Sequence, residues 1–222
     1  GYTQKQWGKN PKHLPESIFN RLPIRFSYNE DYYPQTQYQG IPKNGYTEIF
    51  KNLIKNKNIK IKLNATYKLN YKIKPKYLTI YTGPLDSLFK YKFGKLEWRS
   101  LVFKKQIKKT KDYQGSSVIN YPDLKNKFTR IHEPKHLHPE RKSFNSKSTL
   151  IIKEYSVKND KEPYYPINDE RNRAKHRKYK LEGIKIKKFD FGGRLADYAY
   201  YDMDMTISAA LKKFEQIKKK IK

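Results

Sequence analysis

The 222-residue chain lacks cysteine, has no long apolar run, and contains few acidic residues relative to its basic ones. Without cysteine it forms neither a disulfide nor a thiolate metal site, which fits a reducing compartment, so we expect a cytoplasmic location. No apolar stretch reaches the roughly 20 residues of a membrane-spanning helix. The sequence also contains no P-loop and no nucleophile elbow. These absences argue against a membrane partner and against the commonest hydrolase chemistries.

The acidic deficit leaves a net charge of +29, from 50 lysines and arginines against 21 aspartates and glutamates. A charge of that size attracts nucleic acid or any polyanion without sequence preference. The lysines are spread along the chain, however, and only Lys218-Lys219-Lys220 form a run. This distribution favours a solvated surface, and a basic nucleic-acid-binding protein stays open as the alternative.

Hydrophobic periodicity predicts a mixed fold with both α/β and α+β character. The α/β part is expected to consist of a helix over 46–54, strands over 59–63, 77–81 and 184–189, and a C-terminal helix. Between them come four strand candidates without an intervening helix, over 96–103, 117–121, 128–131 and 149–155. Such a run predicts an antiparallel sheet with one solvated face.

Shorter elements complete the prediction. Ile18, Phe19 and Leu22 share one face of a predicted helix, which Pro23 limits to a turn or two. Tyr164-Tyr165-Pro166 is expected to be an edge strand or a loop, because proline cannot donate to a central ladder. Residues 169–182 are typical of a basic surface helix.

Acid–base and metal chemistry find little support in the side-chain spacing. His132, His136 and His138 share a loop with Glu133, but their spacing matches no standard ligand pattern, so we expect no metal site. Asp202 and Asp204 are two residues apart and point different ways on a helix. They are therefore expected to act separately as caps or cofactor contacts.

The stretch 189–204 is the most distinctive one, because two glycines precede Arg194 and an aromatic cluster. Two interpretations stay open: a backbone that approaches a phosphate at a helix start, or a strand-to-helix turn plugged by aromatic side chains. Arginines and tyrosines also end several separate elements: Arg21, Tyr32, Arg130, Tyr165, Arg194 and Tyr200. Together they predict a nucleotide-diphosphate site, although composition alone does not exclude nucleic acid.

Short motifs then follow one another along nearly the whole chain. They are Gly1-Tyr2-Thr3-Gln4-Lys5-Gln6-Trp7-Gly8, Arg21-Leu22-Pro23-Ile24-Arg25-Phe26, Tyr38-Gln39-Gly40-Ile41-Pro42, Gly45-Tyr46-Thr47, Tyr81-Thr82-Gly83-Pro84-Leu85-Asp86, Trp98-Arg99-Ser100-Leu101, Thr129-Arg130-Ile131, Glu154-Tyr155 and Pro163-Tyr164-Tyr165-Pro166. In this order the chain resembles the bacterial type of UDP-galactopyranose mutase. That family interconverts UDP-galactopyranose and UDP-galactofuranose through an adduct between reduced flavin N5 and the sugar.

The resemblance implies part of a Rossmann-like FAD-binding layer, an antiparallel substrate-binding sheet and the end of a helical domain. The implied boundaries are 1–34 for the helical end and substrate loop, 35–94 for part of the FAD-binding domain, 95–182 for the substrate sheet and 183–222 for the return to the FAD-binding domain. It further implies an isomerase of surface-polysaccharide synthesis with FAD as cofactor, UDP-galactose as substrate and a homodimeric full-length protein.

Site residues follow from the matching motifs. The resemblance implies that these bind the substrate: Tyr2, Thr3, Trp7, Arg21, Tyr32, Asn120, Arg130, Tyr165 and Tyr200. Among them Arg21 and Arg130 are implied to be catalytic through the diphosphate, while Arg194, Asp202 and Met203 are implied to lie beside the flavin.

The chain departs from the family in one respect. Family members open with a strand, a G-x-G-x-x-G turn and a helix that bind the flavin pyrophosphate, and this sequence contains no such motif. We therefore expect these 222 residues alone to hold no FAD and to be inactive. A degenerate product that barely folds is a further alternative, which predicts exposed apolar surface.

Overall fold

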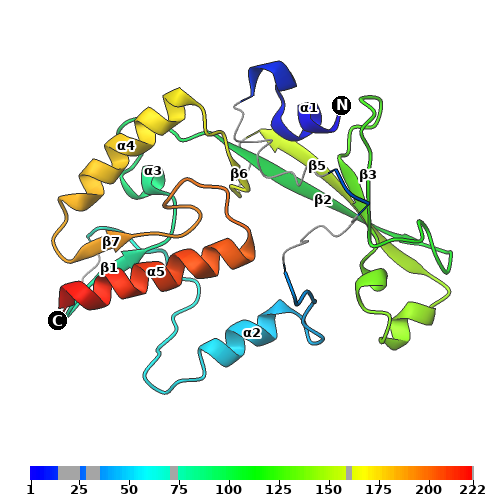
Figure 1. Cartoon of the computed structure of the whole chain (residues 1–222), viewed down its shortest axis with the longest axis horizontal. Coiled ribbons are helices and arrows are strands. Elements are labelled where there is room, and N and C mark those ends of the chain that lie inside the picture. The colour runs from blue at the N-terminus through cyan, green and yellow to red at the C-terminus, as the bar shows by residue number, and fades with distance from the viewer. Residues whose placement is uncertain (15–25, 29–35, 71–74, 159–161, 222) are drawn as a thin grey trace.

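A computed structural model describes residues 1–14, 26–28, 36–70, 75–158 and 162–221, in which two sheets are formed (Figure 1). One has five strands in the order β3-β4-β5-β2-β6, and the other pairs β1 with β7. In Figure 1 the five-stranded sheet occupies the right-hand side, and the two-stranded sheet lies at the left among helices. The mixed fold class expected from the sequence is therefore confirmed, whereas a Rossmann-like layer stays a prediction.

The five-stranded sheet is antiparallel throughout, as predicted. Its strands are β2 (Trp98–Lys108), β3 (Val118–Asn120), β4 (Arg130–His132), β5 (Thr149–Lys158) and β6 (Tyr165–Pro166). β2 and β5 run longer than expected, because they pair continuously from Arg99↔Lys158 to Lys108↔Thr149 and satisfy each other's backbone. β6, with its proline, lies at the edge of the sheet.

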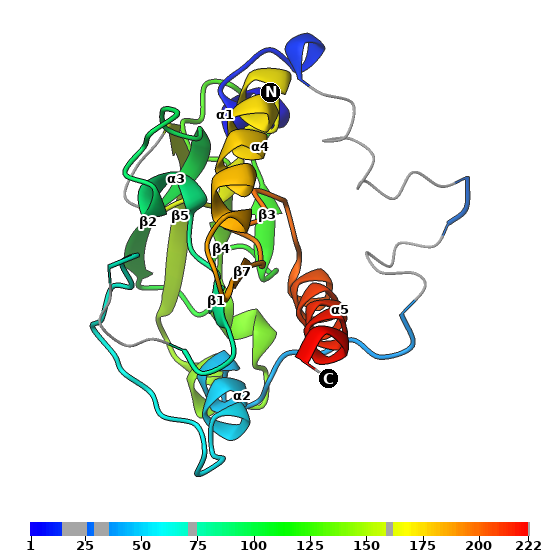
Figure 2. The same cartoon turned by 90° about the vertical axis from the view of Figure 1, so that its left-hand side faces the viewer.

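The second sheet consists of two parallel strands, β1 (Thr79–Tyr81) and β7 (Phe189–Phe191). Around it gather α3 (Leu85–Leu88), α4 (Glu170–Ile184) and α5 (Met203–Ile221) (Figures 1 and 2). The main hydrophobic core lies in this region and comprises Leu85, Leu88, Leu96, Trp98, Tyr179, Phe191, Ala196 and Tyr198. Trp98 starts β2, so this core also joins the two sheets.

Two strand predictions are wrong. Residues 59–63 form no strand, and Ile59, Ile61 and Leu63 are exposed, because alternation gives a strand only where a partner takes up its backbone hydrogen bonds. Residues 184–189 do not form a strand either: α4 continues to Ile184, and β7 begins only at Phe189. The helix, capped at its start by the Asp169 side chain, overlaps the alternating segment only at Ile184, and residues 185–188 form the turn that leads to β7.

The remaining helices are short: α1 (Tyr2–Trp7), α2 (Tyr46–Leu53), and the 3₁₀ turns η1 (Pro11–His13), η3 (Pro134–Leu137) and η4 (Lys142–Asn145). The predicted helices at α2, α4 and α5 are confirmed. The helical turn expected over 18–22 lies outside the described residues. Of the helices that are described, none is both long and apolar enough to cross a bilayer.

Gly192 and Gly193, which follow β7, lie in a turn whose backbone N–H groups donate to other residues of the chain. Gly193 has a φ of +85°, a conformation that glycine adopts freely, and its N–H donates to Asp197 Oδ2 at 3.1 Å. Tyr198 is buried, and its hydroxyl donates to the carbonyls of Glu97 and Ile167. Because α5 begins only at Met203, the geometry favours the turn with an aromatic plug over a phosphate cradle at the glycines.

Candidate functional site

Arg130, the first residue of β4, is held between α1 and β5. One of its Nη atoms donates to the Tyr2 hydroxyl, and its Cζ lies 5.4 Å from the centroid of the Tyr2 ring. On the other side, its Nε lies 3.5 Å from Oε1 of Glu154. The guanidinium is thus oriented by one aromatic ring and one carboxylate from different elements.

Glu154 is the buried carboxylate beside Arg130, and neighbouring side chains hold it in place. Its Oε1 accepts from Thr129 Oγ1 at 3.2 Å, and its Oε2 lies 2.9 Å from His132 Nε2. A buried charge is retained where it is paired and hydrogen-bonded; Arg130 pairs with Glu154, and Thr129 and His132 form hydrogen bonds with it. Sequence reasoning assigned it no role, although a charged residue among the apolar positions of a strand was a usable signal.

Arg194 lies in the loop after β7, over two tyrosine rings. Its Cζ is 5.4 Å from the centroid of Tyr200 and 5.8 Å from that of Tyr165, while an Nη atom donates to the carbonyl of Tyr164. The rings of Tyr165 and Tyr200 are stacked at 5.3 Å with an interplanar angle of 9°. Trp7 from α1 packs 6.1 Å from Tyr165. The structure therefore brings side chains of α1, β6 and this loop together.

Tyr165 connects the two arginines. Burial raises the pKa of its hydroxyl, neighbouring Tyr200 and Glu154 raise it further, and the charges of Arg130 and Arg194 oppose the shift. The phenol is therefore neutral at physiological pH and can donate a hydrogen bond. Two guanidinium groups and a neutral phenol together make a site suited to an anion.

Both arginines also have a donor that makes no hydrogen bond within the described residues, although Nε of Arg130 lies 3.5 Å from Glu154 Oε1. In the part of the chain that the structure describes, Nε of Arg130 and Nε of Arg194 are buried and make no hydrogen bond. A buried N–H without an acceptor is costly. Each guanidinium thus has a buried donor that an oxygen of a phosphate would satisfy.

Arg99 holds α1 in place through hydrogen bonds to carbonyls near the end of that helix. This buried residue donates from Nε to the carbonyl of Gln6 at 2.8 Å and from Nη2 to that of Lys5 at 3.2 Å, and both nitrogens also reach Ser156 Oγ. The last carbonyls of a helix have no partner within the helix, so Arg99 supplies it. Gly8 has a φ of +66°, which side chains rarely adopt, and a Cβ there would lie 2.9 Å from the Arg99 guanidinium, so glycine is favoured at this position.

Lys5 fastens the same helix to the loop between β3 and β4. Its Nζ donates to the carbonyls of Asp123, Asn126 and Phe128 at 2.8 to 3.1 Å, and also to that of Tyr121. Burial lowers the pKa of Lys5, with the charge of Asp123 opposing the shift. Sequence reasoning gave no role to Lys5 or Arg99, since nothing distinguishes them locally among 50 basic residues.

The predicted site residues fall into three groups. Those brought together are Tyr2, Trp7, Arg130, Tyr165, Arg194 and Tyr200. Four others lie nearby along the chain: Thr3 on α1, exposed Asn120 directly across from Arg130 in the β3–β4 ladder, Asp202 before α5, and exposed Met203 at its start. Arg21 and Tyr32 lie outside the described residues. The roles assigned to all of these residues stay predictions.

The three clustered histidines have separate partners. His132 contacts Glu154, His136 contacts Asp112 and Glu133, and His138 lies 3.0 Å from Glu140. They therefore do not converge on one ligand.

Comparison with known proteins gives one consistent family. The family model described as UDP-galactopyranose mutase matches residues 1–200. The chain is 40% identical over 215 residues to a Klebsiella pneumoniae protein named "Probable UDP-galactopyranose mutase", covering 96% of the chain and 54% of that relative. It is 36% identical over 220 residues to dTDP-fucopyranose mutase of Escherichia coli, covering 95% and 57%.

A third relative, UDP-galactopyranose mutase of Mycoplasma genitalium, is 34% identical over 233 residues, covering 97% of the chain and 56% of the relative. The chain thus spans about half the length of the curated relatives it matches.

Proposed function

The chain belongs to the UDP-galactopyranose mutase family, and on that premise we propose that it forms the diphosphate-binding part of an enzyme that interconverts UDP-galactopyranose and UDP-galactofuranose. One observation carries this proposal: Arg194 lies over the Tyr165 ring, the charges of Arg130 and Arg194 both act on the Tyr165 hydroxyl, and each guanidinium has a buried Nε that makes no hydrogen bond to the described part of the chain. A nucleotide diphosphate is the anion that the family's substrates share, and forked guanidinium groups bind it well.

In this proposal the protein stabilises a leaving group. Cleavage of the bond between sugar and diphosphate places negative charge on the diphosphate, and Arg130, held in place by Glu154 and Tyr2, opposes that charge. Removing such a donor costs about 3 to 4 kcal/mol of transition-state stabilisation. The phenol of Tyr165, kept neutral by burial, donates a hydrogen bond without adding charge.

In this proposal FAD binds beside Arg194, at the end of the site opposite Arg130. Arg194 lies there over the Tyr165 and Tyr200 rings, and Asp202 and Met203 stand at the start of α5. When bound, the reduced cofactor would supply the nucleophile for the anomeric carbon. The contribution of the chain is then to orient the cofactor and the sugar nucleotide against each other.

We further propose that these 222 residues alone do not retain FAD or turn over substrate. The sequence has no G-x-G-x-x-G turn for a dinucleotide pyrophosphate. We expect the purified chain mixed with FAD to lose the flavin on gel filtration. A yellow protein with one flavin per chain would contradict this part of the proposal and leave the diphosphate site untouched.

UDP binding by the chain, measured by isothermal titration calorimetry, tests the diphosphate site. We expect Arg130→Ala to weaken UDP binding about 10- to 100-fold, since a hydrogen bond to a charged group contributes about 1.5 to 3 kcal/mol. Arg130→Lys should give a smaller loss, because it keeps the charge but not the fork. Arg171→Ala is the matched control, since this exposed arginine on α4 pairs with Glu97 away from the site.

Equal UDP affinity for the parent, Arg130→Ala and Arg171→Ala proteins would refute the diphosphate site. Tight binding of unrelated DNA that falls steeply with salt, without competition by UDP, would instead favour the basic nucleic-acid-binding alternative. Because one relative is named for a dTDP-sugar, dTDP in a parallel titration measures whether the site distinguishes the two nucleotides.

A further inference from the structure

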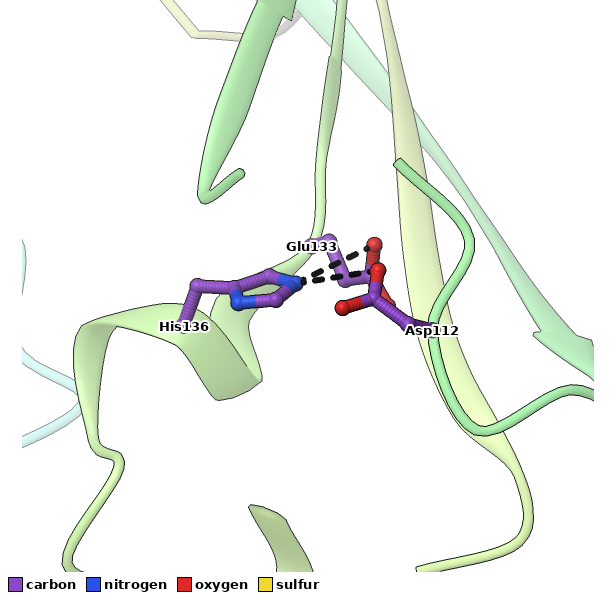
Figure 3. A group of neighbouring side chains, drawn as sticks. All are labelled: Asp112, Glu133 and His136. Carbon is purple, nitrogen blue, oxygen red and sulfur yellow. Dashed lines mark hydrogen bonds and ion pairs between the residues drawn. The ribbon is translucent and has the colours of Figure 1, made fainter. Parts of the chain in front are cut away.

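A second cluster of side chains lies beside the loop that connects β2 to β3, apart from Arg130 and Arg194. It consists of Asp112 from the loop after β2, Glu133 directly after β4, and His136 in η3. One ligand atom from each lies within 4.8 Å of the other two. Figure 3 shows the imidazole nitrogen of His136 facing both carboxylates.

The spacing of these atoms matches the edges of a metal coordination polyhedron. His136 Nε2 lies 3.3 Å from Asp112 Oδ1 and 3.6 Å from Glu133 Oε2. Zinc bonds of 2.0 to 2.2 Å arranged tetrahedrally place neighbouring ligand atoms about 3.3 to 3.6 Å apart. The imidazole nitrogen therefore already stands, from each of the two carboxylate oxygens, at a separation close to the one that a bound ion requires.

The charge balance of the cluster calls for a cation. Glu133 is fully buried, and in the described part of the chain its ion-pair partner is His136 rather than any lysine or arginine. Asp112 adds a second carboxylate to the same group. The other buried glutamate, Glu154, has Arg130 beside it. Since buried charges are paired or coordinate metals, two carboxylates facing one imidazole favour a bound cation between them.

Backbone groups hold both carboxylates in place. The N–H groups of Tyr113 and Gln114 donate to Glu133, and the N–H of Gly115 donates to Asp112 Oδ1 at 2.7 Å. A carboxylate offers about four acceptor positions, so lone pairs remain for an ion. Hydrogen bonds that orient the ligand side chains are typical of protein metal sites.

We propose that Asp112, Glu133 and His136 bind one divalent transition-metal ion, with zinc as the best match. Mixed nitrogen and oxygen ligands at tetrahedral spacing suit zinc, and three protein ligands leave one position for water. The ion would fasten the loop after β2 to the end of β4 and to η3, where Lys135 Nζ already donates to the carbonyl of Lys111 at 2.5 Å. By holding these three segments together, the ion would stabilise this end of the sheet.

Calorimetric titration of the metal-free chain with zinc chloride tests this site. We expect one equivalent to bind, and His136→Gln and Asp112→Asn each to lower the affinity at least tenfold. Glu133 is left unchanged, because its carboxylate also supports two backbone N–H groups. The matched control is the double variant His138→Gln with Glu140→Gln, which removes a similar pair at 3.0 Å and should bind zinc as the parent does.

Two further readouts separate a built site from a folding defect. Cobalt bound to the parent should show the visible absorption of tetrahedral coordination, and the His136→Gln protein should lack it. EDTA should lower the melting temperature of the zinc-loaded parent and leave that of both site variants unchanged. Absence of stoichiometric binding, equal affinity in parent and Asp112→Asn proteins, or loss of binding in the His138 control would each overturn the proposal.

Discussion

In the region of the five-stranded sheet, buried charged and polar groups fasten the elements, whereas the two-stranded layer relies on an aromatic and aliphatic core. On the first side Arg99, Lys5 and Glu154 reach across from one element to another. On the second side Tyr179 and Tyr198 pack with Leu85 and Phe191. The candidate diphosphate site lies where these regions meet, with Arg130 from one and Arg194 from the other.

The contrast bears on how the two arginines of the candidate diphosphate site are oriented. Apolar packing is not directional, whereas hydrogen bonds to a guanidinium fix its orientation. The two-stranded layer also leaves apolar side chains of α5 exposed, among them Ile207, Leu211 and Phe214. The stability of the two-stranded layer should therefore come from its buried side chains alone. The variants below test the sheet region first and then this layer.

The largest effect is expected from Arg99→Ala on the sheet side. The change removes the donor of the Lys5 carbonyl and leaves the Gln6 carbonyl with Ser156 Oγ alone, which should lower the free energy of unfolding by about 2 to 3 kcal/mol. Urea denaturation measures it. Arg171→Ala removes an arginine that is 72% exposed and should cost less than about 1 kcal/mol. Similar losses in both would show that buried charge does not hold this region.

Tyr198→Phe is the corresponding change in the aromatic core. It keeps the ring contact with Trp98 at 4.9 Å but removes the hydroxyl that serves the carbonyls of Glu97 and Ile167. We expect a loss of about 1 to 2 kcal/mol in the free energy of unfolding. Tyr77→Phe, at an exposed position, is the control and should be neutral. A neutral Tyr198→Phe would mean that ring packing alone holds this core.

His176 makes the stability of the same core depend on pH. Burial lowers its pKa below the ordinary 6.5, the charge of Lys180 acts in the same direction, and the Ala196 carbonyl, Asp197 and Asp86 oppose the shift. The unfolded chain then binds a proton that the folded one does not, so this stability is complete above pH 6.5 and is lost as pH falls below it.

The unfolding free energy of the parent, measured by urea denaturation from pH 7 to 5, should therefore fall more than that of His176→Gln. The difference cannot exceed about 1.4 kcal/mol per pH unit for one proton. Parallel curves for the two proteins would show that His176 does not couple folding to protonation.

The smallest effect is expected on the exposed face of α5. Leu211 is 63% exposed, so Leu211→Glu should change the free energy of unfolding by no more than about 0.5 kcal/mol. Ile217 lies on the same helix but is 8% exposed, and Ile217→Glu should be strongly destabilising. Equal losses, measured by urea denaturation, would show that the outer face of α5 is also packed.

Much of the fold could be predicted from local pattern. Alternation predicted the antiparallel sheet, proline placed β6 at an edge, and helical spacing predicted α4 and α5. The same rule failed at 59–63, where no strand pairs with the segment, and at 184–189, where the end of α4 and a turn over 185–188 precede β7. Periodicity records which side chains alternate, but not whether a partner strand is present.

The sequence by itself determined the fold class, the family resemblance and the supply of arginines and tyrosines for an anion site. Only the tertiary structure decided which of 50 basic residues matter, because Arg99, Lys5 and Arg130 act on groups far away in sequence. It also brought Asp112 to Glu133 and His136. Local sequence reflects hydrogen bonding and burial within a few residues, whereas the electrostatics of a site depend on distances that only the folded chain sets.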